Sequence, residues 1–183
     1  MSAGFITYGL LKKDYRAQAT ASELIESLAL SGVYVQTIKR ITGRESPFIA
    51  RENGNSGGDW NPFPSFGAYA KNTSNYDAVP SGHLTTIMSA LTIITTNYPE
   101  YKWIKPVGYS IIGAMCFQML QSEVHWVSDY PLAILLGYFV GKTIATNRFK
   151  ETKNTLGNDK KYSWNFSASR NYDYNLVGAT LKF

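Results

Sequence analysis

The chain has 183 residues, of which 44% are hydrophobic, 14% aromatic and 17% charged, a composition that builds a core and excludes an intrinsically disordered protein. Its single cysteine, Cys116, excludes an intramolecular disulfide framework and a cysteine-built zinc site. Eighteen lysines and arginines against thirteen acidic residues give a net charge of +5. This charge suits an anionic ligand or a phospholipid surface, and because long basic runs are absent we expect no nucleic-acid partner.

Residues 1–15 form an N-terminal segment with a short apolar run, Gly4 to Leu11, and without the basic start of a signal peptide. An amphipathic helix is predicted from about residue 16 to residue 38, because apolar residues recur there at helical spacing: Leu24, Ile25, Leu28, Gly32, Val35 and Ile38. Gly43 and Pro47 end this unit, the first as a left-handed cap and the second as a stop signal.

A long segment, residues 48–79, is rich in glycine, asparagine, serine, proline and aromatic residues. It is predicted to be a loop, and loops of this length often act as functional lids. Three apolar helices are predicted next, at residues 84–98, 106–120 and 130–145. Each is shorter than the run of about 18 to 20 apolar residues that marks an unambiguous transmembrane helix. Two interpretations therefore stay open: buried helices of a soluble bundle, or short membrane helices that line a polar site.

The composition changes after Arg148, and residues 149–183 are predicted to form a linker and a β-hairpin tail. Residues 150–161 are polar, and apolar side chains then alternate with polar ones in residues 162–168 and 177–183, the pattern of two strands. An isolated hairpin is marginally stable in water, so its apolar face must be buried. We expect it to pack against the chain's own helices, with pairing to another sheet or membrane insertion as the alternatives.

The chain has two histidines, and the first, His83, ends the sequence Pro80-Ser81-Gly82-His83. Ser81 is placed to cap the helix that follows, and Gly82 allows the backbone to approach a ligand closely. The first-turn N–H groups and the positive end of the helix dipole favour an anion, so this motif suits phosphate. The alternative is a plain helix cap with a surface histidine.

The second histidine, His125, is followed four residues later by Asp129. If this segment is helical, the two side chains meet, and a carboxylate on one ring nitrogen leaves the other nitrogen free as a nucleophile. The alternative is that Ser128 or Asp129 caps the last helix, with Pro131 in its first turn.

A third cluster, Lys39, Arg40 and Arg44, places three cations within six residues at the end of the first helix. Such a cluster can clamp a phosphoryl group through charge-assisted hydrogen bonds. The alternative is a set of basic residues that complements the negative end of a helix dipole.

Together, the three motifs, Lys39 to Pro47, residues 80–83 and His125 with Asp129, occur in an order that resembles the type 2 phosphatidic acid phosphatase family. That family also includes bacterial acid phosphatases and vanadium haloperoxidases. The resemblance covers residues 16–148 and implies a mostly α-helical bundle as the core, to which the sequence adds the C-terminal β-hairpin.

The resemblance also implies roles for individual residues. It implies that His125 attacks phosphorus to form a phosphohistidine, that Asp129 orients it, and that His83 protonates the leaving alcohol and then assists water. It implies that Lys39 binds phosphate, aided by the Ser81 hydroxyl and the Gly82 N–H. It implies no metal and no cofactor, with vanadate as an inhibitor.

The chain departs from the family pattern at two phosphate-binding arginines. The first is replaced by Ser46, and the Ser-Arg pair that opens the third motif is replaced by Gln118 and Met119. Removing one preorganised donor of this kind commonly lowers the rate by about 100- to 1000-fold. Arg44, two residues before Ser46, and Gln118, as a neutral donor, are the candidates to compensate.

We therefore expect a metal-independent phosphatase that acts on a phosphate monoester or a lipid (pyro)phosphate through a phosphohistidine. The alternatives are a degenerate member that binds phosphate or lipid without turnover, and a haloperoxidase with vanadate as its cofactor. Membrane association in the bacterial cell envelope, with the site facing away from the cytoplasm, is expected, and a soluble periplasmic protein is the alternative. The sequence leaves the oligomeric state open.

Overall fold

The computed structural model describes residues 2–157, 163–171 and 174–182, and it gives side-chain surroundings for residues 2–148. The chain divides into two compact units, residues 1–146 and 147–183, which are described separately. The described residues are mostly helical, as the sequence predicted.

The predicted apolar helices are all present, with somewhat longer boundaries than the sequence pattern indicated. The α-helices are α1 Ser2–Lys12, α2 Tyr15–Thr42, α3 Pro47–Asn53, α4 Phe66–Lys71, α5 Gly82–Asn97, α6 Ile104–Gln121 and α7 Tyr130–Gly157. Two short 3-10 turns complete the set, η1 Thr73–Asn75 and η2 Val127–Asp129. None of the helices in the described part of the chain combines the length and the apolar character needed to cross a membrane.

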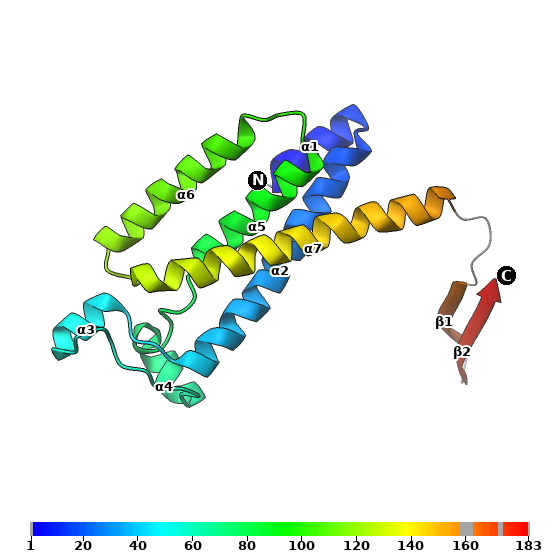
Figure 1. The fold of residues 1–183 in the computed structure, drawn as a ribbon. Helices are drawn as coiled ribbons and strands as arrows, with labels where there is room; N and C mark the ends of the chain where they lie inside the picture. The colour runs from blue at the N-terminus through cyan, green and yellow to red at the C-terminus, as the bar shows by residue number, and fades with distance from the viewer. Residues whose placement is uncertain (1, 158–162, 172–173, 183) are drawn as a thin grey trace. The chain divides into compact units, whose positions relative to one another are not determined.

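Helices α5 and α7 both contribute to the two hydrophobic clusters of the core, and α5 lies between α6 and α2 (Figure 1). One cluster joins α5 to α6 and α7 and consists of Leu84, Met88, Leu91, Ile112, Met119, Tyr130 and Ala133. The other joins α5 to α2 and α7 and consists of Leu24, Ile93, Val140, Ile144 and Ala145. Burial of these apolar side chains fixes the start of α5, where His83 lies, against its neighbours.

Helices α5 and α7 approach each other closely at two glycines of α7. A Cβ atom on Gly137 would lie 2.4 Å from the Thr85 carbonyl oxygen, and one on Gly141 would lie 2.5 Å from the Ser89 carbonyl oxygen. Because a side chain at either position would collide with the backbone of α5, the spacing of the two helices depends on these glycines.

Helix α2 has well-defined caps at both ends. The Asp14 side chain accepts hydrogen bonds from the backbone N–H groups of Arg16 and Ala17 at its start. Gly43 closes its C-terminus with φ of 54° and ψ of 40°, which confirms the predicted left-handed cap. A Cβ atom at Gly43 would lie 1.8 Å from the Asn61 carbonyl oxygen, so both the backbone angle and the lack of space require glycine.

The segment between α2 and α5, predicted as a loop from residue 48 to residue 79, contains the short helices α3 and α4. Pro47, predicted as a stop signal, is the first residue of α3, a position that suits its fixed φ angle. Arg44 forms isolated backbone bridges with Trp60 and Asp77, so the segment folds back on the end of α2. Figure 1 shows α3 and α4 gathered at the end of the bundle where α2 ends and α5 begins.

The second unit contains the end of α7 and two strands, β1 Ser163–Asn171 and β2 Tyr174–Lys182. The strands pair in antiparallel register from Ser163 with Lys182 to Asn171 with Tyr174. Helix α7 continues to Gly157, so residues 150–157, predicted as the start of a linker, are helical. The side chains of this unit beyond Arg148 lie outside the described residues, so the packing of the two paired strands stays a prediction.

Candidate active site

A cavity of about 820 Å³ lies beside α2 and α5. Its polar end is formed where the segment between these two helices meets the end of α2 and the start of α5. Four of the residues predicted for the site line it: Lys39, Gly82, His83 and His125. They come from the last turn of α2, the first turn of α5 and the loop before α7. The fold thus brings three motifs that are far apart in the sequence to one cavity.

Among the described residues that line this cavity, Lys39 is the lysine or arginine, and its side chain is only 9% exposed. Its Nζ atom lies 3.2 Å from Oδ2 of Asp77, which lines the same cavity. Asp77 was not among the site residues predicted from the sequence, although an acidic residue so near the Pro-Ser-Gly-His motif is a signal that could have identified it. The ammonium group is therefore already paired with a carboxylate in a mostly buried position.

The buried imidazole of His125 is held by a backbone carbonyl rather than by a carboxylate. Its Nδ1 atom lies 2.7 Å from the Ala78 carbonyl oxygen, and since a carbonyl only accepts, Nδ1 carries the proton. This tautomer leaves Nε2 with a free lone pair. Asp129 Oδ2 lies 3.9 Å from Nδ1, too far for a hydrogen bond. The expected hydrogen bond between His125 and Asp129 is therefore absent.

Burial lowers the pKa of His125 below its ordinary value, because a charged imidazolium loses hydration in this position. The hydrogen bond to Ala78 opposes this effect, and the positive charge of Lys39 adds to it. The imidazole is therefore neutral at pH 7, which is the form that can act as a nucleophile.

Asp129 is fully buried and pairs with Arg44. Its Oδ1 atom lies 2.5 Å from Nη1 of Arg44, and its Oδ2 atom accepts a hydrogen bond from the Trp126 N–H at 2.8 Å. Burial raises the pKa of the Asp129 carboxyl to about 6, although the Trp126 N–H and the Arg44 guanidinium both oppose the shift. The pair fixes the turn between His125 and α7.

Arg44 was expected beside Lys39 as a phosphate ligand, and the structure places it elsewhere. Its guanidinium lies between the rings of Trp60 and Trp126, 4.9 and 5.0 Å from their centroids, and its Nη1 atom also donates to Ser128 Oγ at 2.8 Å. A buried carboxylate needs a charged partner, and Arg44 is that partner for Asp129. Arg44 does not line the cavity in the described part of the chain.

Two more predicted phosphate ligands lie outside the cavity. Ser81 is fully buried and caps α5, accepting from the Leu84 N–H at 3.5 Å, while its hydroxyl faces the sulfur of Met119 at 3.4 Å. Gln118 is exposed near the end of α6 and donates to Ser122 Oγ at 2.9 Å. Neither side chain therefore lies where a phosphate ligand was expected. Ser81 is placed away from the cavity by its role as a helix cap, and Gln118 by its position on the outer surface of α6.

The positions of the missing arginines differ in their surroundings. Ser46 lines the cavity, and its hydroxyl and backbone N–H both donate to the Ser74 carbonyl oxygen, at 2.9 and 3.0 Å. Met119 belongs to the hydrophobic core. The cationic charge of the cavity is thus lower than the family pattern implies.

The remaining wall of the cavity is largely apolar. It continues from the polar end along α2 and α5 and includes Leu24, Leu28, Val35, Ile87, Ala90 and Met115. The cavity therefore combines a polar end, suited to a phosphoryl group, with a wall that suits an apolar substituent. No group of three or more His, Cys, Asp or Glu side chains placed to hold a metal occurs in the described residues.

Comparison with known proteins matches one family. The model of the PAP2 superfamily matches residues 20–153, which includes α5, α6 and the three motifs. No curated protein and no solved structure matches the chain.

Proposed function

The chain belongs to the PAP2 superfamily, and we propose that its cavity hydrolyses a phosphate monoester or a lipid phosphate through a phosphohistidine intermediate. Membership of this superfamily supports a phosphoryl hydrolase at the coarse level. The observation that carries the finer proposal is the state of His125: a buried, neutral imidazole whose Nδ1 proton is held by Ala78 and whose Nε2 lone pair is free, in the cavity that also holds His83 and Lys39.

In the first step, Nε2 of His125 attacks phosphorus, and the bond from phosphorus to the leaving oxygen breaks. His83 gives a proton to that oxygen, which leaves as an alcohol. Lys39 and the N–H groups at the start of α5 face the phosphoryl oxygens and stabilise their charge. The Ala78 carbonyl stabilises the positive charge that develops on the imidazole.

In the second step, water attacks the phosphorus of the phosphohistidine while His83, now neutral, accepts a proton from it. The bond from phosphorus to Nε2 breaks, and inorganic phosphate leaves. His125 returns to the neutral tautomer with its proton on Nδ1. The reaction is therefore a double displacement in which His83 acts first as acid and then as base.

The apolar wall of the cavity supports a substrate whose phosphate carries an apolar group. Leu24, Leu28 and Ile87 lie along the same cavity as the polar end, so a hydrocarbon next to the phosphate gains contacts that a sugar phosphate does not. Lipid phosphates are the substrates with this chemistry. A lipid-phosphate substrate would place the chain at a membrane, and its location in the cell envelope, with the site facing away from the cytoplasm, stays a proposal.

A second candidate function is phosphate or lipid binding without turnover. The observation that favours it is the charge of the cavity: Lys39 is paired with Asp77, and the arginine positions of the family carry Ser46 and Met119. Fewer donors for the transition-state oxygens lower the rate more than they lower binding.

An assay on the full chain separates these functions. With EDTA present, p-nitrophenyl phosphate, phosphatidic acid and an isoprenyl pyrophosphate are offered in turn. Turnover that is lost in His125→Ala and kept in Gln118→Ala, an exposed control outside the cavity, supports the phosphatase. Saturable phosphate binding without turnover supports the binding protein.

The variant His83→Ala tests the intermediate. Because p-nitrophenolate leaves without a proton, this variant is expected to form the phosphohistidine from p-nitrophenyl phosphate and to hydrolyse it slowly. Radiolabelled phosphate should then accumulate on the protein in an acid-labile, base-stable form. Equal labelling of His125→Ala would contradict the assignment of the nucleophile.

A further inference from the structure

A second cavity, of about 530 Å³, lies between α1, the start of α2 and the loop that follows α5. Helix α5 has 16 residues and a length of about 24 Å, and this cavity adjoins its last residues whereas His83 lies in its first turn. This second cavity is thus at the end of α5 opposite to His83, and it shares no lining residue with the first cavity. Nothing in the phosphatase proposal uses this second cavity, which is called the aromatic cleft below.

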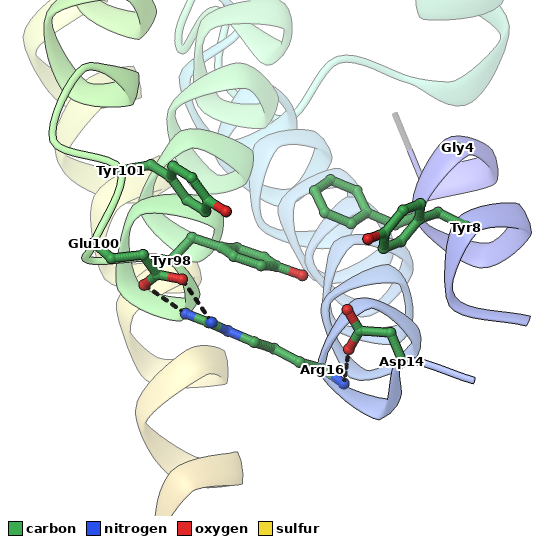
Figure 2. Close-up of a pocket in the computed structure, with 8 residues that line it drawn as sticks. Gly4, Tyr8, Asp14, Arg16, Tyr98, Glu100 and Tyr101 are labelled. Atoms are coloured by element: carbon green, nitrogen blue, oxygen red, sulfur yellow. Dashed lines mark hydrogen bonds and ion pairs between the residues drawn. The ribbon is translucent and has the colours of Figure 1, made fainter. Parts of the chain in front are cut away.

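Four aromatic rings line the aromatic cleft: Phe5, Tyr8, Tyr98 and Tyr101. Figure 2 shows Tyr98 and Tyr101 on one side and Tyr8 on the other, with Asp14 below. Tyr98 is fixed between neighbours, since its ring centroid lies 5.8 Å from that of Phe5 and 6.3 Å from that of Tyr101. Tyr8 and Tyr101 are 54% and 50% exposed, so their rings are available to a ligand.

The rings of the aromatic cleft already hold one cation of the protein. The guanidinium carbon of Arg16 lies 4.2 Å from the centroid of Tyr98, the geometry of a cation–π contact. Arg16 is not available to an anion, because it makes two hydrogen bonds to the Glu100 carboxylate and also donates to the Asn97 carbonyl oxygen. Its charge is neutralised by Glu100.

The remaining charge of the aromatic cleft is negative. Asp14 uses Oδ1 for both cap hydrogen bonds, to the N–H groups of Arg16 and Ala17. Its second carboxylate oxygen lies toward the gap between the tyrosines in Figure 2. Two carboxylates against one guanidinium leave one net negative charge among the lining residues, which also include the four aromatic rings.

We propose that the aromatic cleft binds an organic cation of the alkylammonium class. The ring faces attract the positive charge and contact the methyl or methylene groups around it, and Asp14 supplies the counter-charge. An anion is repelled by Asp14, and a neutral ligand of the same shape gains only the apolar contacts. The volume suits a headgroup or small metabolite rather than a macromolecule.

Calorimetric titration of the full chain tests this proposal, with choline chloride as the probe and 3,3-dimethyl-1-butanol as its uncharged isostere, at constant ionic strength. We expect saturable binding of choline that is about tenfold tighter than that of the isostere, the effect of a cation–π site together with one carboxylate. Equal affinity for the two probes, or no saturation by choline, overturns the proposal.

Three variants locate the binding. Tyr101→Leu and Asp14→Asn should each weaken choline binding about fivefold or more, and Asn keeps the helix cap because it is as good a capping residue as Asp. Tyr34→Leu, which removes an exposed tyrosine on α2 outside the cleft, should leave the affinity unchanged. Circular dichroism melting confirms that each variant is folded. Unchanged affinity in both cleft variants, or an equal loss in Tyr34→Leu, overturns the assignment.

Discussion

Asp77 is expected to compete with phosphate for Lys39, and the variant Asp77→Asn tests this. The carboxylate lies 3.2 Å from the Lys39 ammonium, and its side chain is 30% exposed. A phosphate bound to the same ammonium would lie about 5 Å from this carboxylate, since both anions share one small cation. Asparagine keeps the shape of the side chain and an oxygen that accepts from Lys39, but it removes the negative charge.

The size of the effect follows from Coulomb's law. Two like charges about 5 Å apart interact by about 3 kcal/mol at an effective dielectric constant of about 20. Solvent reaches Asp77 and screens part of this repulsion, so about half of it, roughly 1.5 kcal/mol, is expected to remain. The affinity for inorganic phosphate should therefore rise about tenfold in Asp77→Asn.

Phosphate affinity is measured by calorimetry or by the inhibition of p-nitrophenyl phosphate hydrolysis. The advantage of Asp77→Asn should shrink as salt is added, because the repulsion is screened. Glu26→Gln, which removes an exposed carboxylate of α2 outside the cavity, is the matched control for net charge and should change the affinity little. Unchanged or weaker phosphate binding in Asp77→Asn would refute the reasoning and show that Asp77 instead positions Lys39 for its ligand.

Three further predictions follow from the packing and the protonation of the site. Arg44→Ala leaves the buried carboxylate of Asp129 without its partner and should lower the free energy of unfolding by about 3–5 kcal/mol at pH 7, measured by urea denaturation. The loss should shrink below pH 6, because the carboxyl, whose pKa is already raised to about 6, then becomes neutral. Gly137→Ala forces a Cβ against the backbone of α5 and should cost about 1–3 kcal/mol, whereas Gly113→Ala, with open space around it, should be neutral or stabilising by up to about 1 kcal/mol. Because the pKa of His125 is lowered from its ordinary value of 6.5, its imidazole stays neutral to a lower pH. The loss of kcat/KM on the acid side of the pH profile should therefore have its midpoint below pH 6.5.

Each of these predictions has an outcome that would contradict it. A loss for Arg44→Ala that is the same at pH 5 and pH 7 would show that the Asp129 charge is not the cause. Equal stability of the two glycine variants would show that α5 and α7 can separate without cost. An acid limb above pH 6.5 would mean that burial does not control the ionisation of His125.

Local sequence determined helix α2 and the caps at the end of α2 and the start of α5. The apolar spacing of Leu24, Leu28 and Val35 predicted α2, and Gly43 was identified as its left-handed cap because few residues other than glycine adopt that conformation. Ser81 was likewise identified as the cap of α5. These features depend on residues within a few positions of one another, so a sequence pattern contains the information.

The order and spacing of the three motifs also determined the family, which the match over residues 20–153 confirms. The convergence of Lys39, His83 and His125 on one cavity agrees with that order. The pattern did not reveal the short helices α3 and α4 between the first and second motifs. Glycine, proline and asparagine recur in that segment, and its backbone pairs with residues at and after the end of α2 and with Glu123 after α6, contacts that a local pattern does not specify.

The tertiary structure alone decided which groups meet at the site. The spacing of four residues predicted a contact between Asp129 and His125. Trp126 between them is extended, however, with φ of −76° and ψ of 149°, so the two side chains do not lie on one helical face. The partners that replace this contact are distant in the chain: Ala78 for His125 at a separation of 47 residues, Arg44 for Asp129 at 85, and Asp77 for Lys39 at 38. Such pairs form because buried charges and polar groups must find partners within the folded core, and no local pattern specifies which ones they find.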